Sequence, residues 1–336
     1  MNSTMADFFK EYPGMRYTYF GGKGGVGKTV VAAAVALWMA RQGKKTLLAS
    51  TNPVHSLSNL FKYDVFGRPV LIPGADNLYV QEIDTKDTIE KSKTEIREKM
   101  SWFLKFADIP TKAEDFIESA TMNPAFEESA MFENMINIIF EDAYEFYVFD
   151  TAPTANARRL LGMSKVYALW VDKMMASRKE AKSMRLSLSF RKKKVEEEAD
   201  PLLDYLISFR DRIDQMRTLL TDKEKSAFFF ITLLESLPIA VIRRFIGWFE
   251  DFGIPIGGVI VNQAIDKSEI GKDSAEFIVN RVKMQDRYRE EVKQTFKDLR
   301  GEIPLFEKEV RGLEMVGRLS DALFPNAPNQ PNEPSA

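Results

Sequence analysis

The stretch Gly22-Lys23-Gly24-Gly25-Val26-Gly27-Lys28-Thr29 decides the fold of this chain. It follows the apolar run Tyr17–Phe20, which suits a strand, and it precedes the apolar segment Val30–Ala40, which suits a helix. Glycines in such a turn let successive backbone N–H groups converge on phosphate oxygens, the Lys28 ammonium supplies positive charge, and the Thr29 hydroxyl can hold Mg²⁺. Strand, loop and helix in this order predict a phosphate-binding loop rather than a glycine turn without a ligand.

The loop carries two lysines where the ordinary pattern needs one. Lys23 lies outside the minimal cradle that Lys28 completes. Its charge can therefore point away from its own nucleotide, toward a nucleotide held by a second copy of the chain.

Composition excludes several classes of protein. The 336 residues contain no cysteine, which rules out disulfides, thiolate metal sites, iron–sulfur clusters and a cysteine nucleophile. The formal net charge is −2, which argues against a general nucleic-acid surface. Residues 1–14 lack the apolar core of a secretory signal, and the longest apolar run, Val30–Ala40, is too short to span a bilayer. We expect a cytoplasmic protein that is at most peripheral to a membrane.

Strand-like apolar runs recur along the chain with helical stretches between them, which predicts an α/β fold with a doubly wound, mostly parallel sheet. The expected strands are Tyr17–Phe20, Thr46–Ser50, Leu78–Ile83, Phe146–Phe149, Phe228–Thr232 and Ile256–Val261, and the expected helices include Val30–Gln42 and Ile239–Phe252. We assign residues 15–84, 144–160 and 221–324 to a nucleotide-binding core. We assign residues 85–143 and 161–220 to an inserted all-helical subdomain, and residues 325–336 to a disordered tail.

Two further segments are expected beside the loop, because parallel strands bring their carboxyl ends to one edge of the sheet. Residues 51–59 follow the second strand. Asp150 ends the fourth strand and is placed to hold Mg²⁺, directly or through water. An aspartate at a strand end is more often a helix cap, but its pairing with the loop at Gly22 favours the magnesium interpretation.

Together with two later segments, these motifs resemble one family, the arsenical-pump and guided-entry ATPases, and most closely its single-domain archaeal-type targeting members. The later segments are Val261-Asn262-Gln263 and the region from Ile303-Pro304-Leu305 to Glu309-Val310-Arg311-Gly312. The resemblance runs from about Tyr17 to Phe324. It implies a P-loop NTPase of the SIMIBI type with a deviant Walker A loop, which uses ATP and Mg²⁺, cycles through ADP and works as a homodimer.

The resemblance also implies roles for single residues. Lys23 reaches the partner's phosphates, and Glu235 contacts nucleotide. Asn262 reads the adenine edge, while Pro304 and Leu305 cover the base. Thr29 ligates Mg²⁺, and Asp150 supports that ion from behind its direct ligands.

Three positions depart from the family pattern. Asn52 stands where the family has the aspartate that orients the attacking water. An amide can position water but cannot act as a charged base, so we expect hydrolysis slower by roughly 10²- to 10⁴-fold. Val30 replaces a second hydroxyl residue after the loop, and Ala155-Asn156-Ala157-Arg158-Arg159 replaces a Gly-His-Thr-Leu-Arg run. His55, the only histidine, is interpreted as a hydrogen-bonded residue of the segment after the second strand.

The absence of cysteine separates the family's activities. The resembling pump ATPases bind arsenite and antimonite through thiolates, so metalloid activation is disfavoured, although an arsenical-pump-type ATPase coupled to a transporter stays an alternative. The paired cysteines that clamp zinc in many targeting members are replaced by Ala275 and Ile278, so no zinc site is expected. Asn52 leaves a second alternative open, an ATP-gated holdase with negligible hydrolysis.

The helical segments favour a role in binding hydrophobic clients. Nine of the 15 methionines fall between Met100 and Met216, and flexible, polarizable methionines can repack around many apolar helices. An ordinary helical core explains the same composition, and both interpretations stay open. A transmembrane client helix of about 20 residues is about 30 Å long, so we expect two subunits to share the groove. Residues 178–200 form a charged segment. We interpret it as a solvated helix pair, or else as a lid over the groove or a contact for acidic lipid headgroups or a membrane receptor.

Overall fold

The computed structural model describes residues 3–50, 56–84, 134–150, 201–269 and 275–325, with a few single positions between them, namely Asp87, Thr88, Glu90, Lys91, Thr94, Glu98, Asp172 and Ala176. The elements in chain order are α1 (Met5–Glu11), β1 (Tyr17–Gly21), α2 (Lys28–Arg41), β2 (Thr46–Ser50), α3 (Ser56–Phe61), β3 (Val70–Leu71), β4 (Leu78–Glu82), β5 (Phe146–Asp150), α8 (Pro201–Thr221), β6 (Ser226–Thr232), α9 (Ser236–Asp251), β7 (Ile256–Ala264), the 3₁₀ turn η1 (Lys267–Glu269), α10 (Glu276–Thr295), β8 (Leu299–Pro304) and α11 (Leu313–Leu323).

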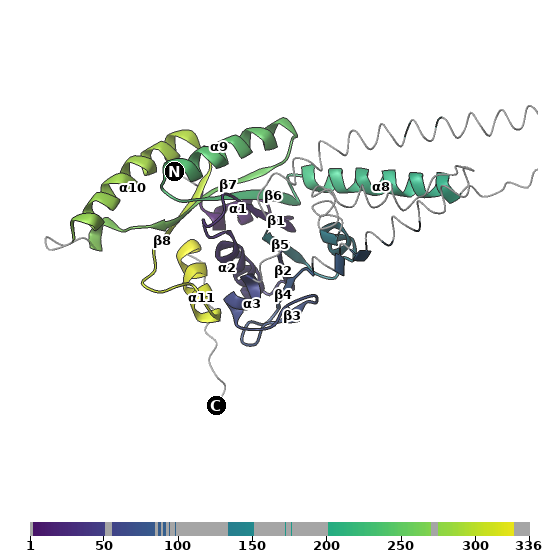
Figure 1. Ribbon diagram of the computed structural model, residues 1–336, viewed down its shortest axis with the longest axis horizontal. Coiled ribbons are helices and arrows are strands. Elements are labelled where there is room, and N and C mark those ends of the chain that lie inside the picture. The colour runs from purple at the N-terminus through teal and green to yellow at the C-terminus, as the bar shows by residue number, and fades with distance from the viewer. Residues whose placement is uncertain are drawn as a thin grey trace, which may run out of the picture.

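The strands form one eight-stranded sheet in the order β3-β4-β2-β5-β1-β6-β7-β8 (Figure 1). Every pairing is parallel except that of β3 with β4. The chain winds from β1 toward β2 on one side and later toward β6, β7 and β8 on the other. The carboxyl end of β1 is therefore the place where the winding direction changes, which is where doubly wound sheets bind ligands.

The α/β fold and all six predicted strands are confirmed. The elements that were not predicted include α1, the short antiparallel β3 and the edge strand β8. The sequence of β8 does not show the apolar pattern of a strand, because it contains charged residues. One of them, Arg300, is buried. The Arg300 guanidinium donates to the carbonyl of Gly257 at 2.5 Å and lies over the ring of Phe8, 5.1 Å from its centroid. These contacts satisfy the buried cation, which a pattern of hydrophobicity alone cannot anticipate.

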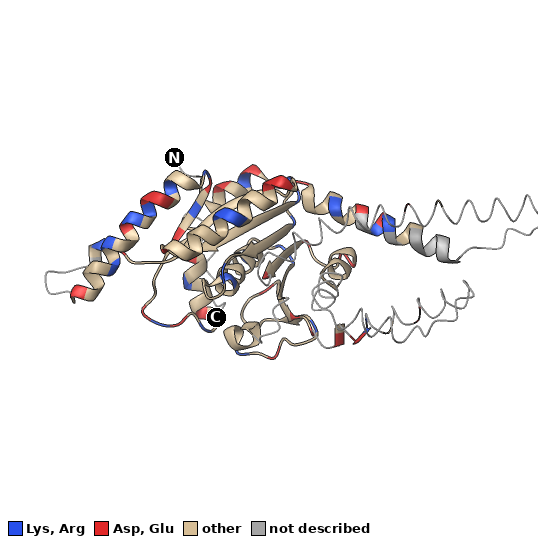
Figure 2. Ribbon diagram, turned by 45° about the horizontal axis from the view of Figure 1, so that its top comes forward, with Lys and Arg blue, Asp and Glu red and all other residues tan. Residues whose placement is uncertain are grey.

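Two helical layers cover the sheet (Figure 1), and successive strand residues supply the two cores alternately. Tyr19 packs into one core with α8, α9 and α10, while Phe20 packs into the other with α1, α2, α3 and α11. Charged residues lie along α9 and α10, whereas the strands between the layers carry few (Figure 2). The sheet is therefore covered by helices on both faces, as its almost uninterrupted apolar strands indicate.

Helix α2 is buried nearly all round because it lies between the sheet and α11. Its sequence from Val31 to Leu37 contains four alanines, and all seven residues are at most 2% exposed. Small side chains let the helix approach the sheet closely. This packing fixes the position of the first turn of α2, which carries Lys28 and Thr29.

Most of the predicted helical subdomain, and all but the first residue of the predicted tail, lie outside the described residues. Residues 134–140 are helical, and α8 extends from the sheet beside them (Figure 1). The division into core and subdomain stays a prediction. Within the described part of the chain, no helix combines the length and the apolar character needed to cross a bilayer.

Candidate functional site

The backbone of the loop after β1 is shaped by glycines at two close approaches. Gly22 has φ +147°, and a Cβ there would run into the carbonyl oxygen of Ile231 on β6. Gly27 has φ +91°, and a Cβ there would run into the side-chain amide of Asn262 on β7. Only glycine satisfies both the space and the backbone conformation at these positions. The loop is therefore pressed against the ends of two neighbouring strands.

The two lysines of the loop have different surroundings. The Lys28 ammonium donates to the backbone carbonyl of Lys23 at 3.3 Å, so it lies across the loop. Burial lowers the pKa of Lys28, and the carboxylate of Asp150 opposes that shift. The Lys23 side chain is half-buried and has no carboxylate partner among the residues that the structure describes.

Asp150 lies at the base of the loop. Its Oδ2 atom accepts hydrogen bonds from the hydroxyl of Thr29 at 2.6 Å and from the hydroxyl of Ser50 at 3.3 Å. Thr29 stands in the first turn of α2, Ser50 ends β2, and Asp150 ends β5, so three elements bring these oxygens together. The expectation that Asp150 and Thr29 lie together is confirmed.

The carboxyl group of Asp150 is 1% exposed, and burial is the main reason that its pKa is raised. The hydrogen bonds from Thr29 and Ser50 and the charge of Lys28 oppose this shift. A nearby divalent cation would favour the charged form, and a hydroxyl with a carboxylate is the oxygen donor set that suits Mg²⁺. Thr29 and Asp150 thus fit the ion. In the described part of the chain, no three His, Cys, Asp or Glu side chains gather as metal ligands.

Glu82 is a buried carboxylate that sequence reasoning missed. It ends β4 at 2% exposure, and in the sheet register Ser50 lies between Glu82 and Asp150. Its Oε1 accepts the backbone N–H of Leu57 at 2.6 Å, and its Oε2 accepts the hydroxyl of Ser58 at 2.6 Å. Glu82 therefore anchors the first turn of α3, directly after residues 51–55. An acidic residue at the end of a strand, the signal that identified Asp150, was present here too.

Asn262 and Glu235 are held by other protein groups in the structure. Asn262 is 4% exposed, and its side-chain N–H donates to the carbonyl of Val26 in the loop at 3.0 Å. Glu235 precedes α9, and its carboxylate accepts from Arg281 at 2.6 Å. The predicted contacts of Asn262 with adenine and of Glu235 with nucleotide stay predictions.

Of the remaining predicted site residues, the structure describes some, and the others lie outside the described residues. Pro304 ends β8, and Leu305 follows it at 53% exposure with its N–H bonded to the carbonyl of Ala264, so this loop lies beside the end of β7. Val30 packs, partly buried, against the core below the loop. Asn52, His55 and residues 151–159 lie outside the described residues.

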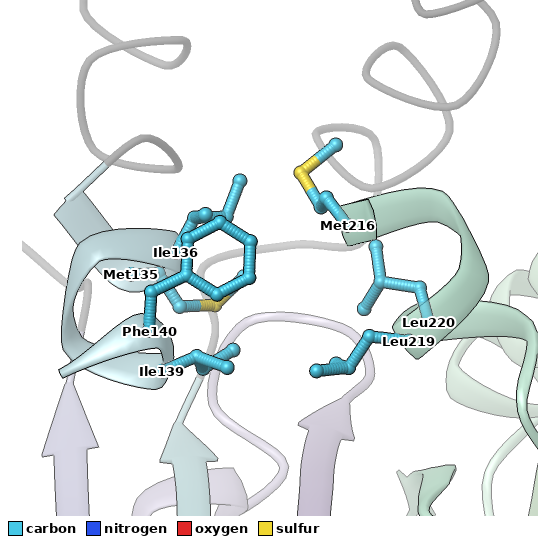
Figure 3. Close-up of a pocket in the computed structure, with 7 residues that line it drawn as sticks. All are labelled: Met135, Ile136, Ile139, Phe140, Met216, Leu219 and Leu220. Carbon is cyan, nitrogen blue, oxygen red and sulfur yellow. The ribbon is translucent and has the colours of Figure 1, made fainter. Parts of the chain in front are cut away.

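The apolar pocket in Figure 3 is lined in part by two methionines of the methionine-rich region, Met135 and Met216. Side chains from residues 134–140 and from α8 face each other across it, and its lining residues are Met135, Ile136, Ile139, Phe140, Met216, Leu219 and Leu220. Its volume is about 10 Å³, room for about one water molecule. Met135 and Met216 are 4% and 7% exposed, so for these two residues the interpretation as ordinary core is confirmed.

Residues 15–325 match the model of the family described as anion-transporting ATPase. The chain belongs to this family. Among its relatives, the protein named ATPase ASNA1 homolog 2 of Paramecium tetraurelia is 28% identical over 94% of this chain and 95% of its own length. An Aquifex aeolicus protein, provisionally named arsenical pump-driving ATPase 2, is 29% identical over 92% of this chain and 99% of its own. ATPase GET3A of Arabidopsis thaliana is 27% identical over 91% and 83%, respectively.

Replacing Asp150 by Asn should stabilise the protein without nucleotide at neutral pH. Burial raises the pKa of Asp150 above its ordinary value, so the folded state favours the protonated form. The charged group therefore destabilises the folded state increasingly as pH rises through the folded pKa. We expect Asp150→Asn to have a higher Tm than the original chain at pH 8, with a difference that shrinks toward pH 4. The measurement is thermal unfolding across this pH range.

The same variant should lose the part of the stabilisation by ATP that depends on Mg²⁺. Asp211→Asn, which removes an exposed carboxylate from α8, is the matched control and should change neither property. A pH-independent difference in Tm between Asp150→Asn and the original chain would show that the buried charge is not its source.

Proposed function

We propose that this chain is an ATP- and Mg²⁺-dependent homodimeric targeting factor that carries transmembrane segments of tail-anchored membrane proteins in a hydrophobic groove and releases them on nucleotide turnover. The observation that carries the proposal is a phosphate cradle with a second lysine. Lys28 lies across the cradle, Thr29 and Asp150 supply oxygens for Mg²⁺, and Lys23 has no carboxylate partner among the described residues. Bound ATP would supply the phosphoanhydride bond that is hydrolysed. Its triphosphate would carry the negative charge that the ammonium groups of both lysines neutralise.

Lys23 is the residue that would couple nucleotide to pairing. Its backbone carbonyl accepts from Lys28, so the point from which its side chain leaves the loop is fixed. A half-buried ammonium without a carboxylate partner carries a charge that triphosphate on a facing copy would neutralise. With no cysteine to clamp zinc at Ala275 and Ile278, the dimer would depend on packing and on the shared nucleotides.

The client class is supported by chemistry and by the relatives. A chain without cysteine lacks the thiolates that bind arsenite, which disfavours a metalloid-activated pump despite the name of the Aquifex relative. Relatives named GET3 and ASNA1 favour the targeting role. The groove would be formed in residues 85–143 and 161–220. The factor would act in the cytoplasm, with a membrane receptor as a further partner and no nucleic acid.

Asn52 would make turnover slow. At this position the family has a water-orienting aspartate, and an amide cannot supply the negative charge of a base. ATP would then persist in the closed dimer and prolong the client-bound state. An ATP-gated holdase is the limiting case of the same cycle.

Lys23→Ala should prevent ATP from closing the dimer. We expect the original chain to double its mass in ATP and Mg²⁺ and to retain a tail-anchored segment during purification, whereas Lys23→Ala stays monomeric and releases the segment. Because Lys28 still serves the variant's own site, ATP affinity of the monomer should change less than about threefold. Light scattering and isothermal calorimetry measure these quantities.

Lys10→Ala, which removes an exposed lysine from α1, is the control and should dimerise normally. A segment held by a monomer without nucleotide would contradict the shared groove, and normal dimerisation of Lys23→Ala would contradict the role of Lys23.

Asn52→Asp should raise ATP turnover about 10²-fold, because it restores a charged group beside the attacking water. Steady-state release of phosphate at saturating ATP is the measurement, with Asn59→Asp as the control substitution in the same region. Equal turnover by Asn52→Asp and the original chain would remove Asn52 from the role of positioning water.

A further inference from the structure

Helix α10 carries three polar side chains at four-residue spacing, and each bonds near the carboxyl end of a different strand. Arg281 donates to Glu235, just after β6, at 2.6 Å, and Arg289 donates to Glu302 of β8 at 2.8 Å. Between them, Gln285 bonds to the end of β7 and to the residue that follows it. Residues four apart lie on one face of a helix. One face of α10 therefore holds the three strand ends on one side of the phosphate-binding loop.

Gln285 is the most buried of the three, at 4% exposure. Its Oε1 accepts the backbone N–H of Ile265 at 2.8 Å, and its Nε2 donates to the backbone carbonyl of Gln263 at 3.1 Å. The two bonds lie on either side of Ala264. A single side chain thus fixes the chain direction where β7 ends.

The backbone at this point is in an unusual conformation. Gln263 has φ +55°, which residues other than glycine seldom adopt, and the pairing of β7 with β8 shifts register between Val261 and Ala264. Such a conformation persists only where its surroundings hold it. Gln285 supplies two of the contacts that do so.

Asn262 immediately precedes this turn and touches the phosphate-binding loop. Its side-chain amide donates to the carbonyl of Val26 and fills the space that a Cβ at Gly27 would need. The direction of the Asn262 side chain depends on the backbone that Gln285 holds. The contacts therefore run from α10, through residues 262–265, to the loop.

We propose that Gln285 is a positioning residue for nucleotide binding, which acts through Asn262 on the phosphate-binding loop. The proposal rests on the proposed binding of ATP and extends it to a residue that touches neither phosphate nor base. Gln285 shapes the loop before ligand arrives, so that binding need not order residues 262–265. A purely structural glutamine would affect the Tm and leave the affinity of the folded protein for ATP unchanged.

The test is ATP affinity by isothermal calorimetry for Gln285→Met, which keeps the length of the side chain and removes both hydrogen bonds. We expect affinity to fall about tenfold at a temperature where the variant is folded. On an Asn262→Ala background the same change should alter affinity less than about twofold, because the path already lacks its last contact. Gln294→Met, at an exposed glutamine of the same helix, is the control and should bind ATP normally.

Gln285→Glu provides a second variant if methionine prevents folding. It keeps the acceptor for Ile265 and loses the donor to Gln263, so we expect affinity to fall at least threefold. Unchanged ATP affinity in the folded variants would overturn the positioning role, as would equal losses with and without Asn262. Failure of the original chain to bind ATP would instead overturn the proposed function and this inference with it.

Discussion

The phosphate-binding loop passes so close to the ends of β6 and β7 that two of its positions have no room for a side chain. Gly22 meets the carbonyl of Ile231, and Gly27 meets the amide of Asn262. The shape of the loop is therefore set by the sheet, before any ligand binds. The contacts of Gly22 and Gly27 with the strand ends also fix the positions of Lys28 and Thr29, because α2, which carries both residues, begins where the loop ends.

The carboxyl edge of the sheet carries two buried carboxyl groups, and burying a charged carboxylate costs folding free energy. Asp150 and Glu82 are both buried, and Glu82 contributes to the raised pKa of Asp150. The Glu82 carboxylate is satisfied by protein groups, because it accepts hydrogen bonds from the first turn of α3. Asp150 accepts only hydroxyl donors in the contacts that the structure gives it, and a cation would complete its surroundings. A buried carboxyl group whose pKa is raised by its surroundings is typical of a functional site.

Hydrophobic pattern and the glycine loop were enough to predict the sheet, its parallel strands and the meeting of Thr29 with Asp150. They were not enough for β8, because the buried Arg300 is stabilised by the carbonyl of Gly257 and the ring of Phe8, which are distant in the sequence, as well as by Asp298 nearby. Glu82 also lies at the end of a strand, but its partners, the N–H of Leu57 and the hydroxyl of Ser58, lie about 25 residues away and are brought to it only by the fold. The contact of Gln285 with residues 263 and 265 depends on an unusual backbone turn and could not be read from spacing. The local sequence thus identified the phosphate-binding loop, whereas the residues that hold the surrounding strands and helices in place could be identified only from the structure.

The most direct test of this account compares ATP affinity in Gly27→Ala and Gly43→Ala. Both glycines have a positive φ, +91° and +84°, so both substitutions strain the backbone, but a Cβ at Gly43 meets nothing within 4 Å. We expect Gly27→Ala to weaken ATP binding about hundredfold, because it displaces Asn262 and with it the loop, and Gly43→Ala to bind within about twofold of the original chain. Equal affinity of the two variants would contradict the claim that the sheet sets the shape of the loop.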